Sequence, residues 1–99
     1  MINIMKCKGE FEGGQLVLTY GVNNAIAEDL KFSKFVLDSL QRHLAGDWGD
    51  MEGVDKEENN FSVDKHLRLF SSYRFDSGKI WIITEADRSA TTVLFPDEY

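Results

Sequence analysis

The fold is decided by residues 67–95, which run LRLFSSYRF (67–75), DSG (76–78), KIWIITE (79–85), ADRSA (86–90) and TTVLF (91–95). Strand-forming residues alternate with a period of two in the first, third and last segments. The segments between them carry the Asp, Ser and Gly residues that turns require. The pattern predicts an antiparallel meander of three strands, Leu67–Phe75, Lys79–Glu85 and Thr91–Phe95.

The alternation also assigns the side chains of this meander to two faces. One face of the first strand takes Leu67, Leu69, Ser71, Tyr73 and Phe75, and the other takes Arg68, Phe70, Ser72 and Arg74. On the second strand, Ile80, Ile82 and Thr84 lie opposite Trp81 and Ile83. Such alternation is typical of a sheet that is covered on one face.

A helix over Ser33–Leu44 is predicted to provide that cover. Its apolar residues recur at helical spacing in one stripe, formed by Phe32, Phe35, Val36, Leu40 and Leu44. Helix and meander together predict an α+β fold with two layers around one core. The expected core residues are Phe35, Val36, Leu40, Leu44, Ile80, Ile82, Val93 and Trp81.

The remaining segments predict smaller elements within a single domain, residues 1–99. Ile2–Lys8 and Gln15–Tyr20 can pair as an N-terminal β-hairpin across a glycine-rich turn. Asn23 or Asn24 can cap a short helix that ends near Leu30. A further short helix is expected over Asp55–Val63.

Composition restricts the class of protein. The 99 residues carry 17 acidic and 11 basic side chains, and the formal net charge of −6 disfavours general coating of nucleic acid or of an anionic membrane. Cys7 is the only cysteine, so neither an internal disulfide nor a zinc site of several thiolates can form. Without a signal-peptide pattern or a long apolar run, we expect a cytoplasmic protein with no membrane span, metal or cofactor.

The candidate site residues fall into two groups. The first follows the long helix, where His43 and Asp47 could form a base and its orienting carboxylate. Asp47 and Asp50 flank Trp48 and give only a weak metal signal, because no calcium-loop pattern continues beyond them. The simpler interpretations are a histidine that satisfies helix-end carbonyls, carboxylates with turn and capping roles, and a tryptophan in the core.

The second group lies on the meander and its turns. It consists of Tyr73, Arg74, Glu85, Arg88, Thr91 and Thr92. Arg88 and the threonine hydroxyls could hold a phosphate. The simpler interpretation is a polar turn with an Arg–Glu surface pair. If helix and central strand run parallel, both groups meet where the Gly46–Asp50 loop approaches the Thr84–Thr92 turn.

From Leu40 onward the chain resembles a family of small bacterial proteins labelled "plasmid-related", which travel on mobile elements. The similarity rests on LQRH (40–43), GDWGD (46–50), SSY (71–73) and IWIITEADRSATTVLFPDEY (80–99). It covers roughly the C-terminal 60 residues. The resemblance implies a mobile-element context and no specific activity.

These observations lead to two functional hypotheses. The first is a non-catalytic binding module, an accessory or anti-defence inhibitor that binds a basic host protein or a small nucleotide. The acid-rich stretch Asp47–Glu58 could then mimic a nucleic-acid backbone, or could simply be solvated. The alternative is a small metal-independent ribonuclease using His43, Glu85 and Arg88, which requires those three side chains to converge in one cleft.

Overall fold

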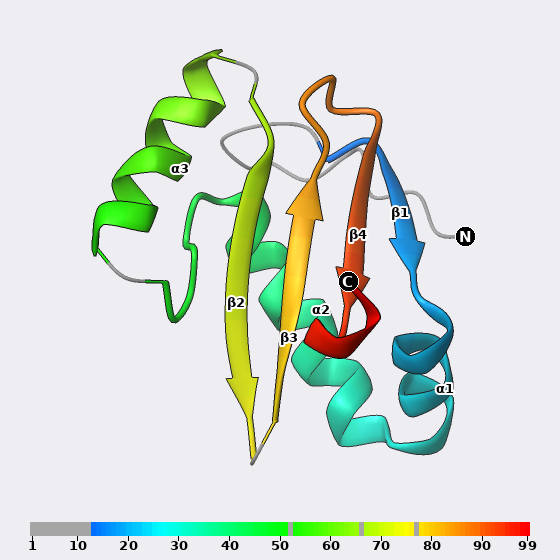
Figure 1. The fold of residues 1–99 in the computed structure, drawn as a ribbon. Helices are drawn as coiled ribbons and strands as arrows, with labels where there is room; N and C mark the ends of the chain where they lie inside the picture. Colours follow the sequence, from blue (N-terminus) through cyan, green and yellow to red (C-terminus); the bar gives the residue numbers. More distant parts are fainter. Residues whose placement is uncertain (1–12, 52, 66, 77) are drawn as a thin grey trace.

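A helical layer packs against one face of a sheet of four strands, so the predicted α+β class is confirmed (Figure 1). The computed structural model describes residues 13–51, 53–65, 67–76 and 78–99. Its strands are β1 (Gln15–Leu18), β2 (Leu69–Phe75), β3 (Gly78–Thr84) and β4 (Ala90–Leu94). Its helices are α1 (Tyr20–Glu28), α2 (Leu30–Leu44), α3 (Gly53–Lys65) and a final 3-10 turn, η1 (Pro96–Glu98).

The predicted meander is confirmed. The strand order is β1-β4-β3-β2, and both β2–β3 and β3–β4 are antiparallel. The register pairs Ser72 with Trp81 and Arg74 with Lys79. Strand β2 begins two residues later than predicted, because the Leu67 amide donates to the Ser62 carbonyl at the end of α3.

The fourth strand, β1, was not expected to join this sheet through the C-terminal strand. It pairs with β4 in parallel, with Leu16 opposite Thr91. It ends before Tyr20, where the sequence predicted it to continue, because the Thr19 side chain caps α1 by accepting from the Val22 amide. The predicted hairpin partner, Ile2–Lys8, lies outside the described residues.

Helix α2 supplies the core layer, as predicted, but it begins three residues earlier. Asp29 is its N-cap, and the carboxylate accepts from the amides of Lys31 (2.9 Å) and Phe32 (3.3 Å). The apolar stripe is buried against the sheet together with Ile80, Ile82 and Val93. The predicted helix at Asp55–Val63 is also confirmed, within the longer α3.

Trp81 does not belong to this core, contrary to the prediction. It is half-buried on the face of the sheet that α2 leaves uncovered, where its ring contacts Phe70 and Tyr99. The reason is the strand period of two, which turns Trp81 away from its core neighbours Ile80 and Ile82.

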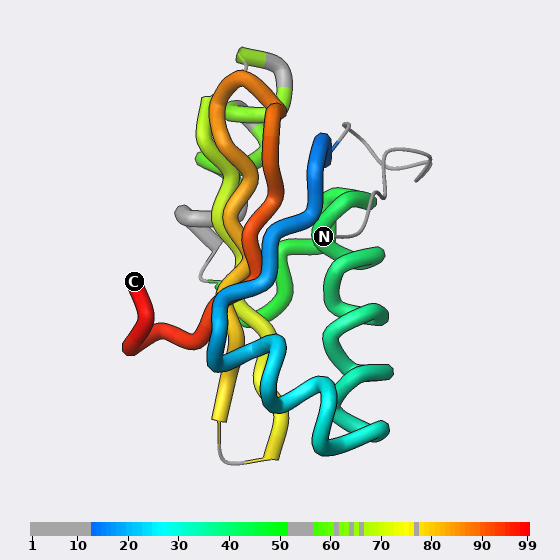
Figure 2. Tube along the Cα trace, turned by 90° about the vertical axis from the view of Figure 1, so that its right-hand side faces the viewer, coloured from blue at the N-terminus to red at the C-terminus, as the bar shows by residue number. Residues whose placement is uncertain are grey.

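The two faces of the sheet are therefore covered differently, as Figure 2 shows. We call the face toward α2 the inner face and the opposite one the outer face. The C-terminal η1 lies on the outer side, and Glu98 fixes it there. One Glu98 oxygen accepts from the Thr19 hydroxyl (2.6 Å) and the other from the Gly21 amide (2.9 Å), which brings Tyr99 over the outer face.

Polar groups from outside the sheet cover the edge of β2. The carboxamide of Asn59, on α3, accepts from the Phe70 amide (3.2 Å) and donates to its carbonyl (2.5 Å). Two residues further on, Ser72 bonds to the Trp48 carbonyl and the Asp50 amide. These contacts occupy backbone groups that would otherwise be open to another strand.

Candidate functional site

His43 is the centre of a buried polar cluster at the inner face. Its side chain has 0% exposure, and it reaches from the last turn of α2 to both neighbouring strands. Nδ1 bonds to the hydroxyl of Ser71 on β2, and Nε2 lies 2.8 Å from the hydroxyl of Thr84 on β3. The Thr84 hydroxyl in turn lies 2.8 Å from the Thr91 hydroxyl. The Thr91 hydroxyl donates to the Gly13 carbonyl at 2.7 Å.

The Gly13 carbonyl at the end of this hydrogen-bonded series fixes the direction of the three bonds nearest to it. Because Gly13 O can only accept, Thr91 donates to it and must accept from Thr84. Thr84 has then used its proton and accepts from Nε2–H of His43. These bonds place a proton on Nε2. The Ser71 hydroxyl can donate or accept, so the state of Nδ1 depends on the charge of the ring, and in a neutral ring Nδ1 accepts from Ser71.

Burial favours the neutral state. The pKa of His43 falls to about 3, chiefly because the charged ring would lose its hydration, with a smaller contribution from the Arg88 charge. A general base works best with a pKa near the working pH and with access to its proton donor. His43 has neither, and its ring nitrogens join α2 to β2 and β3.

The loop after α2 is also bound into the fold. Trp48 is 3% exposed, packs edge-on against His43, and donates from Nε1 to the Asn60 side chain at 2.9 Å. The Tyr73 hydroxyl is buried beneath the loop and donates to the Asp47 carbonyl at 2.5 Å. The Asp47 carboxylate pairs with Arg42, with 2.7 Å between Oδ2 and Nε. The Asp50 side chain points to solvent.

Arg88 uses its guanidinium on backbone carbonyls. Nη2 donates to the carbonyls of Ser62 (3.0 Å) and Val63 (3.5 Å), near the C-terminal end of α3. Nη1 donates to those of Leu67 (2.7 Å), Glu85 (3.1 Å) and Ala86 (3.2 Å). A cation at a helix C-terminus is favoured by the helix dipole. Arg88 therefore joins the end of α3 to the turn after β3. Both of its Nη atoms donate to backbone carbonyls in this arrangement.

The two predicted groups come together only in part. Helix α2 and strand β3 run in the same direction (Figure 1), which is why His43 reaches Thr84. Thr91 lies in the same cluster, but neighbouring Thr92 points to the outer face. Glu85 is half-buried and pairs with Arg68 at 3.6 Å. His43 and Glu85 thus lie in different environments, since the His43 side chain is fully buried and the Glu85 side chain is 44% exposed.

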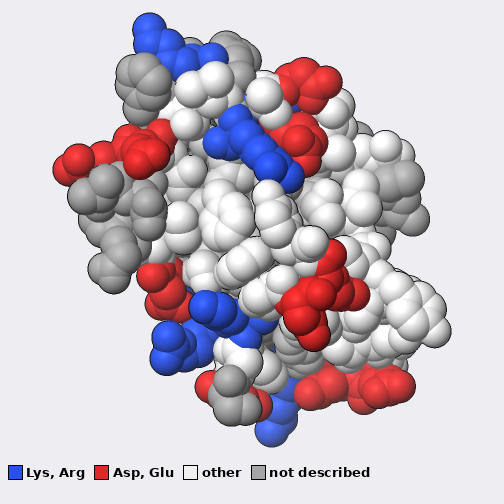
Figure 3. Space-filling model, in the orientation of Figure 1, with Lys and Arg blue, Asp and Glu red and all other residues white. Residues whose placement is uncertain are grey.

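The outer face provides a different kind of surface. Its cross-strand neighbours include Phe70, Ser72 and Arg74 on β2 and Lys79, Trp81 and Ile83 on β3. Uncharged side chains occupy the middle of this face, and charged ones lie around it (Figure 3). Three aromatic side chains lie side by side here, and we call Phe70, Trp81 and Tyr99 the aromatic row. The ring centroids of Phe70 and Trp81 are 4.9 Å apart, and those of Trp81 and Tyr99 are 5.8 Å apart. Arg68 stacks on Tyr99 and donates to its hydroxyl at 3.2 Å.

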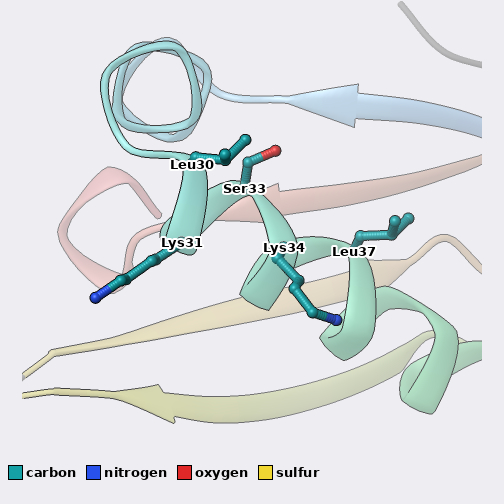
Figure 4. Close-up of a pocket in the computed structure, with 5 residues that line it drawn as sticks. All are labelled: Leu30, Lys31, Ser33, Lys34 and Leu37. Carbon is teal, nitrogen blue, oxygen red and sulfur yellow. The ribbon is translucent and has the colours of Figure 1, made fainter.

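The exposed side of α2 carries a second, smaller feature (Figure 4). Leu30, Lys31, Ser33, Lys34 and Leu37 line a shallow hollow of about 400 Å³. Leu30 and Leu37 are 85% and 52% exposed, and Lys34 pairs with Asp38 one turn along the helix at 3.2 Å. A single helix face with two exposed leucines offers little area for a stable complex.

Among the described residues, no three His, Cys, Asp or Glu side chains are placed to share a metal ion. The same part of the chain contains no helix long and apolar enough to cross a membrane. Comparisons with protein families, with curated proteins and with solved structures found no match for this chain.

Sequence reasoning missed two sets of residues that matter. Ser71 was not singled out, although alternation had already placed its hydroxyl and that of Thr84 on the core face. Buried hydroxyls need partners, and a histidine on the covering helix was the available one. The aromatic row was missed because Phe70 and Trp81 look like ordinary strand residues, and Tyr99 reaches them only through the fold of η1.

Proposed function

We propose that this protein is a non-catalytic binding module, an accessory or anti-defence inhibitor of a mobile element. The observation that carries the proposal is the state of His43, which is fully buried, neutral and bonded at both ring nitrogens. Arg88 is likewise committed to backbone carbonyls. The residue types that would transfer protons or hold a transition-state charge are used here to join structural elements.

The outer face is the surface that supports binding. Its middle is uncharged (Figure 3), and Tyr99 is exposed there beside the half-buried Phe70 and Trp81. Within the aromatic row, Trp81 and Tyr99 combine large contact area with polar tips, a combination enriched where proteins bind ligands. The biological context is the one that the resemblance of residues 40–99 to mobile-element proteins would imply, in which a small binding protein acts by occupying a component of the host.

The experiment is a plasmid-transformation assay in bacteria with an active CRISPR or restriction system. We expect the wild-type chain to raise the number of transformants and Trp81→Ala to lose that effect. His43→Gln should retain it if circular dichroism finds the variant folded. Should His43→Gln not fold, Glu85→Gln serves the same purpose, because the ribonuclease alternative needs Glu85 and the binding hypothesis does not.

Two results would contradict the proposal. One is loss of protection in a folded His43→Gln or Glu85→Gln variant while Trp81→Ala remains active. The other is turnover of an RNA substrate by the purified wild-type protein that these substitutions abolish. Either result would favour the ribonuclease alternative.

A further inference from the structure

The aromatic row gathers three rings on one face of the sheet, with interplanar angles of 57° between Phe70 and Trp81 and 76° between Trp81 and Tyr99. Phe70 and Trp81 stand on neighbouring strands with their centroids 4.9 Å apart, and Tyr99 follows at 5.8 Å. Tyr99 is 69% exposed, while Phe70 and Trp81 are half-buried. Nucleobases stack on aromatic side chains presented by a sheet, whatever their sequence, because every base has a π-face.

Two cations lie beside this row on the same face. Arg74 and Lys79 are cross-strand partners, and Ser72 and Trp81 are the partners two residues away, about 7 Å along the strands. Arg74 and Lys79 are both exposed. Within the described parts of the chain, the ion pairs use Lys34, Arg42 and Arg68 and leave these two cations out. Asp76, in the turn beyond them, is the nearest acid in sequence.

The charge pattern distinguishes between possible ligands. A basic protein surface laid on the aromatic row would bring its cations against Arg74 and Lys79, which is unfavourable. A long polyanion would meet the acids that give the whole chain a formal charge of −6. A small anion with an aromatic part avoids both problems, because it touches only the aromatic row and the cations beside it.

We propose that the outer face binds nucleotides, with a base stacked on the aromatic row and a phosphate held by Arg74 and Lys79. The ligand is a free nucleotide, since a single base with its phosphate needs only the aromatic row and the two cations beside it. The inference rests on the proposed function and names the ligand class for it.

The test is a fluorescence titration of the full-length protein. One ligand is a fluorescein-labelled single strand of about eight nucleotides, and unlabelled mononucleotides serve as competitors. We expect the anisotropy of the label to rise and tryptophan emission to fall. Trp48 is 3% exposed, so the quenching should report Trp81 and should be reduced in Trp81→Phe.

Charge reversal provides the matched comparison. Arg74→Glu with Lys79→Glu should raise the dissociation constant at least about tenfold, and added salt should do the same to wild type. Lys31→Glu with Lys34→Glu makes the same change in net charge on the exposed side of α2 (Figure 4) and should alter binding less than about twofold. Trp81→Ala should weaken binding about tenfold through lost stacking. Circular dichroism checks the fold of each variant.

The outcomes separate the ligand sources and the two proposals. Competition by mononucleotides would support the free nucleotide, and binding of the oligonucleotide without such competition would overturn it in favour of a single strand. No anisotropy change and no quenching, or equal weakening in both charge-reversal variants, would overturn the nucleotide proposal and leave a binding module intact. Cleavage of the oligonucleotide during the titration would instead overturn the proposed non-catalytic function.

Discussion

The two faces of the sheet use polar and aromatic residues for opposite purposes. On the inner face, His43, Ser71, Thr84 and Thr91 are each less than 2% exposed and joined in one hydrogen-bonded chain. On the outer face, the aromatic row and the cations beside it keep accessible surface. The residues that most resemble an active site in the sequence stabilise the fold, and ordinary strand residues form the surface available to a ligand.

The largest loss of stability should come from removing His43, the centre of the hydrogen-bonded series on the inner face. His43→Ala leaves the hydroxyls of Ser71 and Thr84 without their partner and opens a cavity, so we expect a loss of about 3 kcal/mol in the free energy of unfolding. Urea denaturation followed by circular dichroism measures it. Gln41→Ala, at an exposed position of the same helix, should change stability little. Similar losses of unfolding free energy in His43→Ala and Gln41→Ala would contradict a stabilising role for the buried hydrogen bonds of the inner face.

The inner face should also make stability depend on pH. Below pH 6.5 the unfolded chain takes up a proton on His43, whereas the folded chain does so only near pH 3. Stability from this residue is therefore complete above pH 6.5 and falls as the pH is lowered, by about 2 kcal/mol at about pH 5. Urea titrations of wild type and His43→Gln across this range give the difference. Because His66 is present in both proteins, equal pH slopes would argue against a buried neutral His43.

Two adjacent threonines offer the closest comparison between the faces. Thr91→Val removes the donor to the Gly13 carbonyl and the acceptor for Thr84 inside the core, and should cost about 1–2 kcal/mol. Thr92→Val makes the same chemical change on the outer face, where valine keeps the strand preference, and should be close to neutral. Thermal unfolding of the two variants provides the measurement. A greater loss for Thr92→Val would reverse the assignment of faces.

The smallest change in the free energy of unfolding is expected for a substitution on the outer face. Glu85→Gln breaks the pair with Arg68, whose side chains are 44% and 50% exposed. An exposed ion pair contributes little, so the change in unfolding free energy should stay below about 0.5 kcal/mol. Denaturation at low and high salt would detect a larger contribution. A loss comparable with that of Thr91→Val would mean that the outer face is also needed for the fold.

The sequence predicted the elements well where one local pattern was sufficient. Period-two alternation identified the meander, and helical spacing identified α2 and its buried stripe. Helix starts were less accurate, because Thr19 and Asp29 both precede stretches with other candidate caps. The parallel pairing of β1 with β4 could not be inferred, since it joins segments more than 70 residues apart through backbone bonds that carry no sequence pattern.

For the candidate site, the sequence by itself determined which residue types were available and on which face of a strand each one lies. Only the tertiary structure decided their roles. His43 became structural because α2 runs parallel to β3 and delivers the ring to Thr84, in a place from which water is excluded. Arg88 joins α3 to the turn after β3 because α3 ends beside its guanidinium. Burial and hydrogen bonding depend on segments distant in the chain, and those two quantities decide whether a polar side chain can react, bind or only hold the fold together.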